Sequence, residues 1–135
     1  MRNYEQDIAK VLASEQEIQS AVRRICREIE NDFKDSDKKL LIMGTLKGAV
    51  VFMADLMKEF NYRAEIDFIK VSSYGSGTNS GGIVSLKSEP DRNNLSDYNV
   101  IIIEDILDTG NTLHWLLNHV KNDLKANTVK LCALF

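Results

Sequence analysis

Three carboxylates and a short polar loop are the residues of this chain best suited to do chemistry. Glu104 and Asp105 follow the apolar run Val100–Ile103, and a third acid, Asp108, comes three residues after Asp105. The polar string Thr109–Thr112 completes the segment, and apolar residues at helical spacing follow it. We therefore predict a strand, a loop and a helix in direct succession, with a loop that holds a cation on one side and a phosphate on the other.

The two adjacent acids suit a diol or a hydrated metal ion. Successive side chains of a strand point to opposite faces, so we do not expect Glu104 and Asp105 to grip one ion as a fork. We expect them to accept hydrogen bonds from vicinal hydroxyl groups, or to touch a hydrated Mg²⁺. This ion takes few protein oxygens and keeps several of its waters.

The polar string after the third acid suits a phosphate. Thr109, Gly110, Asn111 and Thr112 offer backbone N–H groups and two hydroxyls where a helix begins, and the helix dipole favours an anion there. A sugar phosphate fits both halves of the segment, with its diol on the acids and its 5′-phosphate on the loop. The simpler alternative is a solvated strand end in which Asp108 or Thr109 caps the helix. No GK[ST] string follows, which disfavours a P-loop nucleoside triphosphatase.

Helices and strands alternate along the chain around this segment. Ser14 and Glu17 form a predicted capping box at the start of a helix whose apolar residues recur up to Phe33. Strands are predicted at Leu40–Met43, Glu65–Ser72, Ile83–Leu86, Val100–Ile103 and Thr128–Phe135, and further helices at Ala49–Phe60 and Leu113–Leu124. The alternation predicts one α/β domain with a mostly parallel sheet flanked by helices.

Composition narrows the classes of function. The chain has 135 residues and a formal net charge of −3, which argues against a nucleic-acid binder with a basic face. No apolar run approaches the roughly 20 residues that span a bilayer, and the polar N-terminus does not resemble a secretory signal. Cys26 and Cys132 lie in apolar surroundings, and we interpret them as buried free thiols of a cytoplasmic protein. We expect neither a nucleic-acid partner nor a membrane.

Two histidines and the single tryptophan follow the acid-rich loop. His114 and His119 are five residues apart on the predicted helix, so they point in different directions and make a poor metal pair. We interpret both as ordinary helix residues. Trp115 lies within the same helix, and we expect it to pack in the core or at an interface.

Two further strings accompany the acid-rich segment VIIIEDILDTGNT. They are LIMGTLKGAVVFMADL at Leu41–Leu56 and VSSYG at Val71–Gly75. In this order and spacing, the three strings resemble the 6-oxopurine phosphoribosyltransferases, which belong to the type I phosphoribosyltransferases. The resemblance runs from about Ser14 to Phe135. It implies that family's α/β core and its purine salvage activity. In that reaction, phosphoribosyl pyrophosphate (PRPP) and hypoxanthine or guanine give IMP or GMP and pyrophosphate, with Mg²⁺ as the cofactor.

The resemblance gives the acid-rich loop specific roles. Glu104 and Asp105 would hold the ribose hydroxyls and, often through water, Mg²⁺. Asp108 would be the general base that takes a proton from the purine ring nitrogen. Thr109–Thr112 would form the 5′-phosphate loop, although Asn111 stands where many relatives carry lysine. A backbone donor can serve that position, so we expect a weaker electrostatic contribution and no loss of function.

The other two strings acquire roles in the same way. Leu46, Lys47 and Gly48 would form the pyrophosphate loop, which in this family often contains a non-proline cis peptide. Ser73 and Tyr74 would belong to a mobile loop that closes over the reacting centre and excludes water. The alternatives are an ordinary surface lysine at Lys47 and an ordinary hairpin tip after Tyr74.

Members of this family continue past the strand that ends here at Phe135. Their continuation carries a hood with a lysine that recognises the 6-oxo group, an aromatic residue that stacks on the purine and an aspartate that binds Mg²⁺. None of these has a counterpart in this sequence. We therefore expect residues 1–135 to be a core domain truncated at the C-terminus, which keeps affinity for PRPP or pyrophosphate but turns over poorly or not at all. The family also implies a homodimer or homotetramer.

Two other functions remain open at this point. One is a non-catalytic regulator that senses PRPP or a nucleotide on the same fold. Asp108 favours the enzyme, because a sensor needs no general base. The other is a receiver-like signalling domain with clustered acids, in which the LKG and DTGNT strings would have no role.

Overall fold

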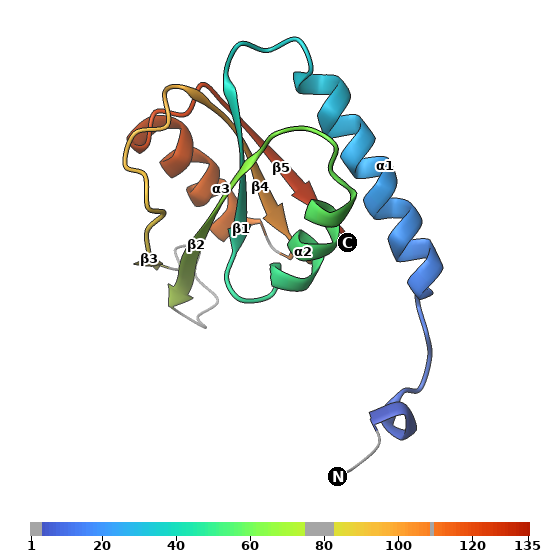
Figure 1. Cartoon of the computed structure of the whole chain (residues 1–135). Helices are drawn as coiled ribbons and strands as arrows, with labels where there is room; N and C mark the ends of the chain where they lie inside the picture. Colours follow the sequence, from blue (N-terminus) through green and yellow to red (C-terminus); the bar gives the residue numbers. More distant parts are fainter. Residues whose placement is uncertain (1–3, 75–82, 109) are drawn as a thin grey trace.

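Five strands form one sheet at the centre of the computed structural model, which describes residues 4–74, 83–108 and 110–135. They are β1 (Lys39–Thr45), β2 (Glu65–Tyr74), β3 (Ile83–Ser88), β4 (Tyr98–Glu104) and β5 (Thr128–Ala133), in the spatial order β3-β2-β1-β4-β5. All neighbouring strands are parallel except β2 and β3, which form an antiparallel pair (Figure 1). The predicted mostly parallel α/β sheet is confirmed.

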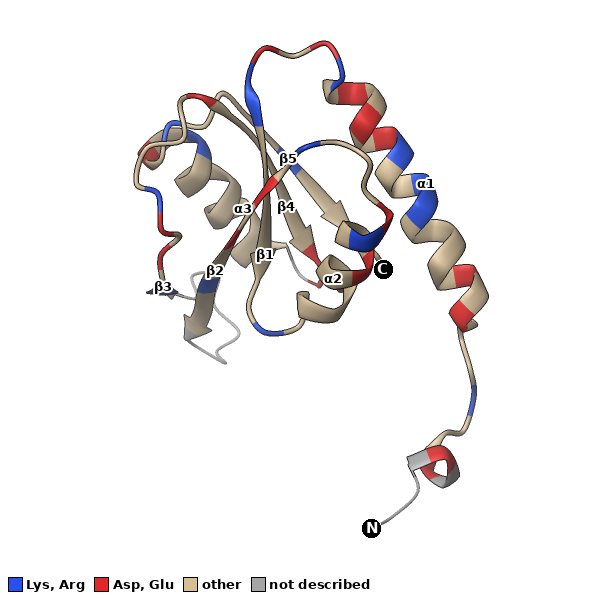
Figure 2. Cartoon of the chain, in the orientation of Figure 1, with Lys and Arg blue, Asp and Glu red and all other residues tan. Residues whose placement is uncertain are grey.

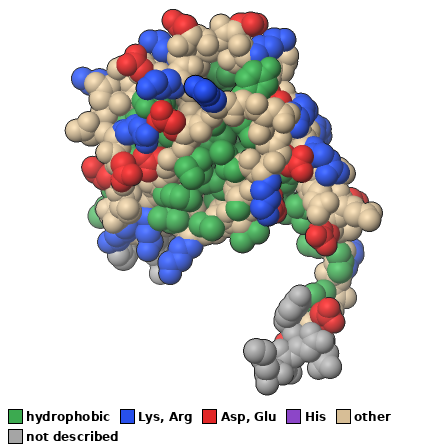
Figure 3. All heavy atoms as spheres, in the orientation of Figure 1, with side chains coloured by type: hydrophobic (Ala, Val, Ile, Leu, Met, Phe, Trp, Pro, Cys, Tyr) green, Lys and Arg blue, Asp and Glu red, His purple; other side chains and the backbone are tan. Residues whose placement is uncertain are grey.

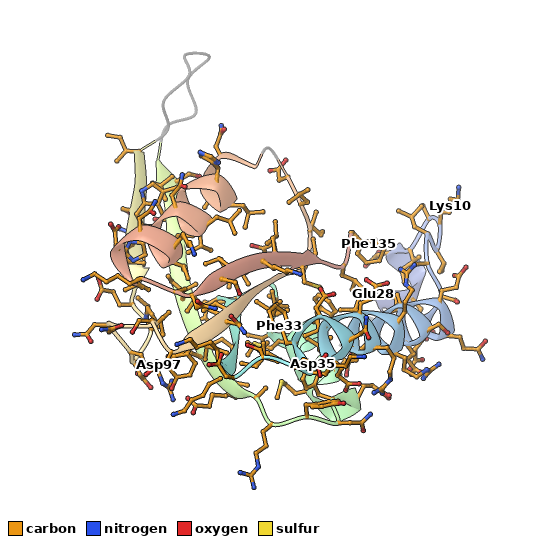
Figure 4. The ribbon with its side chains drawn as sticks, turned by 90° about the horizontal axis from the view of Figure 1, so that it is seen from above. Lys10, Glu28, Phe33, Asp35, Asp97 and Phe135 are labelled. Atoms are coloured by element: carbon orange, nitrogen blue, oxygen red, sulfur yellow. The ribbon has the colours of Figure 1, made fainter. Side chains whose placement is uncertain are left out.

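Helices cover both faces of the sheet. The helices α1 (Glu15–Phe33) and α2 (Val50–Glu59) lie on one face, and α3 (Asn111–Asn118) lies on the other (Figures 1 and 4). The predicted helix at Leu113–Leu124 is α-helical only as far as Asn118, and a π-helical turn, η2 (His119–Asp123), follows it. The short 3-10 helix η1 (Tyr4–Asp7) belongs to an N-terminal segment that extends away from the body.

Alternation along the central strands explains how the sheet serves two cores. On β4, Ile101 and Ile103 pack in the core under α1 and α2, whereas Val100 and Ile102 pack in the core under α3. A strand covered on both faces reads as a continuous apolar run, as VIII does here. The capping box that starts α1 is also confirmed, because the hydroxyl of Ser14 accepts from the N–H of Glu17 at 3.1 Å and the Glu17 carboxylate accepts from the N–H of Ser14 at 2.7 Å.

The chain reverses its direction across the sheet between β1 and β4. From β1 it passes through α2 to β2 on one side, and from β4 it passes through α3 to β5 on the other. At such a switch point the two loops that leave the carboxyl ends of the strands diverge and open a crevice, where ligands bind in α/β sheets. The fold thus brings the loop after β1 next to the loop after β4.

Burial largely agrees with the expectation for the two cysteines. Cys26 is fully buried and its Sγ contacts the carbonyl O of Leu56 at 3.4 Å, while Cys132 is partly buried, and both are free thiols. Burial raises the pKa of each thiol to about 11.

Within the described part of the chain, no helix has the length and apolar character needed to cross a bilayer.

These thiols are expected to resist alkylation in the native protein at pH 8 and to react once the protein is unfolded, because little thiolate is present. The folded-state pKa of about 11 lies above the ordinary value of 9.0, so the thiols contribute stability that is full below pH 9 and is lost as the pH rises toward 11. Mass spectrometry after timed alkylation, with and without urea, measures each site separately. Rapid native labelling of Cys26 at pH 8 would contradict its burial.

Candidate active site

The acid pair lies at the carboxyl end of β4. Glu104 is the last residue of the strand and Asp105 is the first residue beyond it, and both are partly buried. Burial raises the pKa of Glu104, and a hydrogen bond between the two carboxyl groups raises it further. The same hydrogen bond lowers the pKa of Asp105. Asp105 is therefore the acid of the pair that more readily carries a negative charge.

The two acids interact where the strand ends. Since β4 ends at Glu104, the alternation that holds within a strand does not fix the direction of the Asp105 side chain. The two carboxyl groups shift each other's pKa, and the N–H of Asp105 donates to Oε1 of Glu104 at 3.1 Å. The pair forms one acidic site rather than two separate ones.

The loop that follows β1 packs directly on this site. The peptide bond between Leu46 and Lys47 is cis, as the resemblance to the family implied. A Cβ atom placed on Gly48 would lie 2.6 Å from Oδ2 and 2.9 Å from Oδ1 of Asp105, so only glycine fits against this carboxylate. Lys47 is exposed at the tip of the loop. Figure 2 shows the acidic end of β4 and the basic loop before α2 at the same end of the sheet.

Two helices begin beside the acids without a side-chain cap. The residue at the cap of α2 is Ala49, and the residue at the cap of α3 is Gly110, which has a φ of 83°. Their first N–H groups are free of the capping bond that Ser14 provides for α1. The alternative in which Asp108 caps the helix is not what the structure has, because Asp108 is exposed and Gly110 occupies the cap position.

The remaining predicted residues lie at the same end of the sheet. Asn111 and Thr112 form the first turn of α3, and Thr109 lies outside the described residues. Ser73 and Tyr74 end β2, pair with Val84 and Ile83 of β3, and so stand at the base of a hairpin. The mobile loop was expected to begin at Ser73, but Ser73 and Tyr74 belong to β2, and the rest of the expected loop, residues 75–82, lies outside the described residues. Since Thr45 pairs with Ile69, the hairpin extends past the end of β1.

The side chains of the two histidines and the tryptophan contact residues of α3 and η2 rather than the acid pair. The rings of Trp115 and His119 stack with a centroid distance of 4.9 Å, and Nδ1 of His119 lies 2.7 Å from Oδ2 of Asp123. Nε2 of His114 lies 3.1 Å from the side-chain nitrogen of Asn118. Trp115 packs against the core on the α3 face, as expected.

Sequence reasoning missed one residue of the site, Thr45. It lies beyond the strand predicted at Leu40–Met43, but it is the buried last residue of β1, and its hydroxyl donates to the carbonyl O of Ile103 at 3.2 Å, just before Glu104. The apolar run Leu40–Met43 gave no signal for a polar partner one strand away. A hollow of about 730 Å³ between α1 and α2 reaches Gly48 and Asp105, so the site is open on this side.

Comparisons with known proteins agree with this geometry. The profile of the phosphoribosyl transferase domain family matches residues 9–135. The hypoxanthine-guanine phosphoribosyltransferase of Streptococcus pyogenes serotype M3 is 44% identical over 131 residues, which cover 97% of this chain and 71% of the relative.

Two solved structures share the fold. The hypoxanthine phosphoribosyltransferase of Staphylococcus aureus superimposes with a TM-score of 0.85 at 32% identity, over 96% of this chain and 68% of the other. The hypoxanthine-guanine phosphoribosyltransferase of Bacillus anthracis superimposes with a TM-score of 0.80 at 36% identity, over 93% of this chain and 70% of the other. The similarity therefore extends beyond the motifs to nearly the whole fold described above.

Proposed function

Because this chain belongs to the phosphoribosyl transferase domain family, we propose that its function is purine salvage. It transfers the phosphoribosyl group of PRPP to hypoxanthine or guanine, and the products are IMP or GMP and pyrophosphate. The observation that carries the proposal is the contact between two loops distant in sequence. Gly48 of the loop after β1 lies against the carboxylate of Asp105 in the loop after β4.

PRPP matches the order of features along this contact. The molecule has a pyrophosphate at one end of its ribose, a phosphate at the other end and a diol between them. The site has an uncapped helix start at α2, an uncapped helix start at α3 and the acid pair at the end of β4. Helix N-termini favour anions, and carboxylates accept hydrogen bonds from hydroxyls. In this proposal Leu46–Gly48 binds pyrophosphate, and Asp108–Thr112 binds the 5′-phosphate.

The acid pair also fits the Mg²⁺ on which the proposed reaction depends. Among the residues that the structure describes, no group of three or more His, Cys, Asp and Glu side chains could hold a metal alone. This suits an ion that binds through one or two carboxylates together with substrate phosphates. Glu104 and Asp105 would hold it, and the lowered pKa of Asp105 keeps this carboxylate ionised and available to the ion. When bound, Mg²⁺ neutralises charge on the pyrophosphate.

Asp108 supplies the proton transfer in the proposed mechanism. Its carboxylate takes the proton from the purine ring nitrogen, and that nitrogen forms a bond to C1′ of the ribose. The bond from C1′ to the pyrophosphate oxygen breaks, and its electron pair leaves with pyrophosphate. Asp108 is exposed in the loop between the acid pair and the start of α3, which gives a purine access to it. Ser73 and Tyr74 are proposed to help exclude water from the reacting centre.

Gly48→Ala is expected to weaken Mg²⁺–PRPP binding by about tenfold, the effect of losing one hydrogen bond to a charged group. The new methyl group must displace the Asp105 carboxylate, which a Cβ would approach to 2.6 Å. Calorimetry measures the affinity. Val50→Ala is a matched control, because Val50 lies two residues further on and is 42% exposed. An affinity equal to wild type in Gly48→Ala would argue against Asp105 as a ligand of the substrate.

The proposed transfer can be measured directly with the polypeptide of residues 1–135, whose motifs resemble those for PRPP. Incubation with radiolabelled hypoxanthine and Mg²⁺–PRPP is expected to give formation of IMP that depends on PRPP. Formation of no nucleotide from hypoxanthine or guanine would count against transferase activity in this polypeptide.

The partner expected from the family is a second copy of the chain. Figure 3 shows hydrophobic side chains gathered on the face that carries β2 and α2. Val50 and Val51 of α2 are 42% and 72% exposed, and Ile66 of β2 is 50% exposed. Burying these side chains against a second copy would remove them from water. Sedimentation equilibrium is expected to give at least twice the monomer mass of 15.3 kDa, and a monomer at all concentrations would contradict it.

A further inference from the structure

Thr45 is a buried polar side chain at the centre of the site, and none of the roles above uses it. It is the last residue of β1, and only 6% of its surface is exposed. The sheet fixes it on both sides, because Thr45 pairs with Ile69 of β2 and the preceding Gly44 pairs with Ile103 of β4. A β-branched side chain held between two strands has few rotamers, so its hydroxyl has a defined direction.

The hydroxyl of Thr45 faces β4. Its Oγ1 donates to the carbonyl O of Ile103 at 3.2 Å. That carbonyl belongs to the residue just before Glu104, and the Thr45 hydroxyl also lowers the pKa of the Glu104 carboxyl group against the larger effect of burial. The N–H of Asp105 donates to Oε1 of Glu104 at 3.1 Å. Glu104 thus accepts a hydrogen bond from its own chain, and the backbone at its base accepts one from the neighbouring strand.

We propose that Thr45 is a positioning residue, whose bond to the carbonyl just before Glu104 fixes the end of β4 so that the Glu104 carboxylate can receive the ribose diol of PRPP. The inference rests on the proposed function and deepens it. A glutamate that is free to move loses conformational entropy when a ligand fixes it. By holding the backbone at the base of Glu104, Thr45 limits that movement before the ligand arrives, and pre-organisation of this kind strengthens binding.

The proposed role of Thr45 predicts different effects on the binding of PRPP and of pyrophosphate. PRPP carries the diol and needs Glu104, whereas pyrophosphate carries no diol and is proposed to lie on Leu46–Gly48. Loss of the Thr45 hydroxyl should therefore weaken binding of PRPP and leave binding of pyrophosphate unchanged. A residue that merely stabilised the end of β1 would affect both ligands, because Thr45 directly precedes the pyrophosphate loop.

Thr45→Val keeps the shape of the side chain and removes the hydroxyl, and Thr45→Ser keeps the hydroxyl. Calorimetry is expected to show about tenfold weaker Mg²⁺–PRPP binding by Thr45→Val and an affinity within about twofold of wild type for Thr45→Ser. Mg²⁺–pyrophosphate should bind wild type and both variants equally. If the valine variant does not fold, Thr45→Ala compared with Thr45→Ser isolates the hydroxyl in the same way.

Two results would overturn the role of Thr45 without affecting the proposed function, provided that the wild-type protein binds both ligands. One is an unchanged PRPP affinity in the variants that lack the hydroxyl. The other is an equal weakening of PRPP and pyrophosphate, which marks a structural role. A folded wild-type protein that binds neither ligand overturns the proposed function, and the inference falls with it.

Discussion

Asp108→Asn is expected to lower the rate of phosphoribosyl transfer by about 10²- to 10⁴-fold, the usual contribution of a general base. Asparagine has nearly the same shape as aspartate but does not accept the proton of the purine nitrogen. Affinity for Mg²⁺–PRPP should stay within a few-fold of wild type, because the proposed contacts to the diol and the pyrophosphate lie on other residues and asparagine keeps the backbone donors of the 5′-phosphate loop. Quenched-flow or long-incubation assays with radiolabelled hypoxanthine measure the rate, and calorimetry measures the affinity.

A control for the Asp108 variant must remove a negative charge elsewhere. Asp37→Asn serves this purpose, because Asp37 is an exposed acid in the loop before β1, at the opposite end of the sheet. Its rate should equal that of wild type. An unchanged rate in Asp108→Asn would show that another group takes the proton. A protein that binds PRPP but makes no nucleotide in any form would instead favour the sensor alternative.

Asp105→Asn is expected to weaken Mg²⁺–PRPP binding by about 100-fold. Charged hydrogen bonds contribute about 1.5–3 kcal/mol each, and 1.4 kcal/mol corresponds to a factor of ten. Asp105 is the acid of the pair that ionises more readily, because its pKa is lowered, and its interaction with the Glu104 carboxyl group is the largest cause of that shift. Removing the charge should therefore weaken both the metal contact and the diol contact.

Asp55→Asn is a matched control for this variant. Asp55 lines the same hollow as Asp105, lies on α2 and makes a surface ion pair with Lys58 at 3.3 Å. Its loss should leave the affinity unchanged, since exposed pairs of this kind contribute little. An equal loss of affinity in Asp55→Asn and Asp105→Asn would point to a general effect of charge in the hollow rather than a specific ligand.

The sequence was sufficient to predict the fold class and the place of the acid loop. The apolar run before Glu104, the capping box at Ser14 and the alternation of helices and strands are local patterns, and the structure confirms all three. The cis peptide at Leu46–Lys47 was expected only from the family resemblance. These features depend on neighbouring residues or on short motifs, which a single sequence displays directly.

The contacts within the site could not be predicted in the same way. The approach of Gly48 to Asp105 and the hydrogen bond from Thr45 to the carbonyl of Ile103 join segments that are far apart in the chain. They depend on the pairing of β1 with β4 and on its register, in which Gly44 lies opposite Ile103. The direction of the Asp105 side chain depends on where β4 ends. A shift of one residue in the register of β1 on β4, or in the position where β4 ends, would place a different side chain beside the acids.

Calorimetric titration of the folded 135-residue protein with Mg²⁺–PRPP tests the central claim most directly, because binding at the acid pair comes before every later step. Saturable binding at one site per chain is expected, and this binding should be strongly weakened in Asp105→Asn and retained in Asp108→Asn. A protein shown by circular dichroism to be folded, yet giving no heat with Mg²⁺–PRPP, would contradict it.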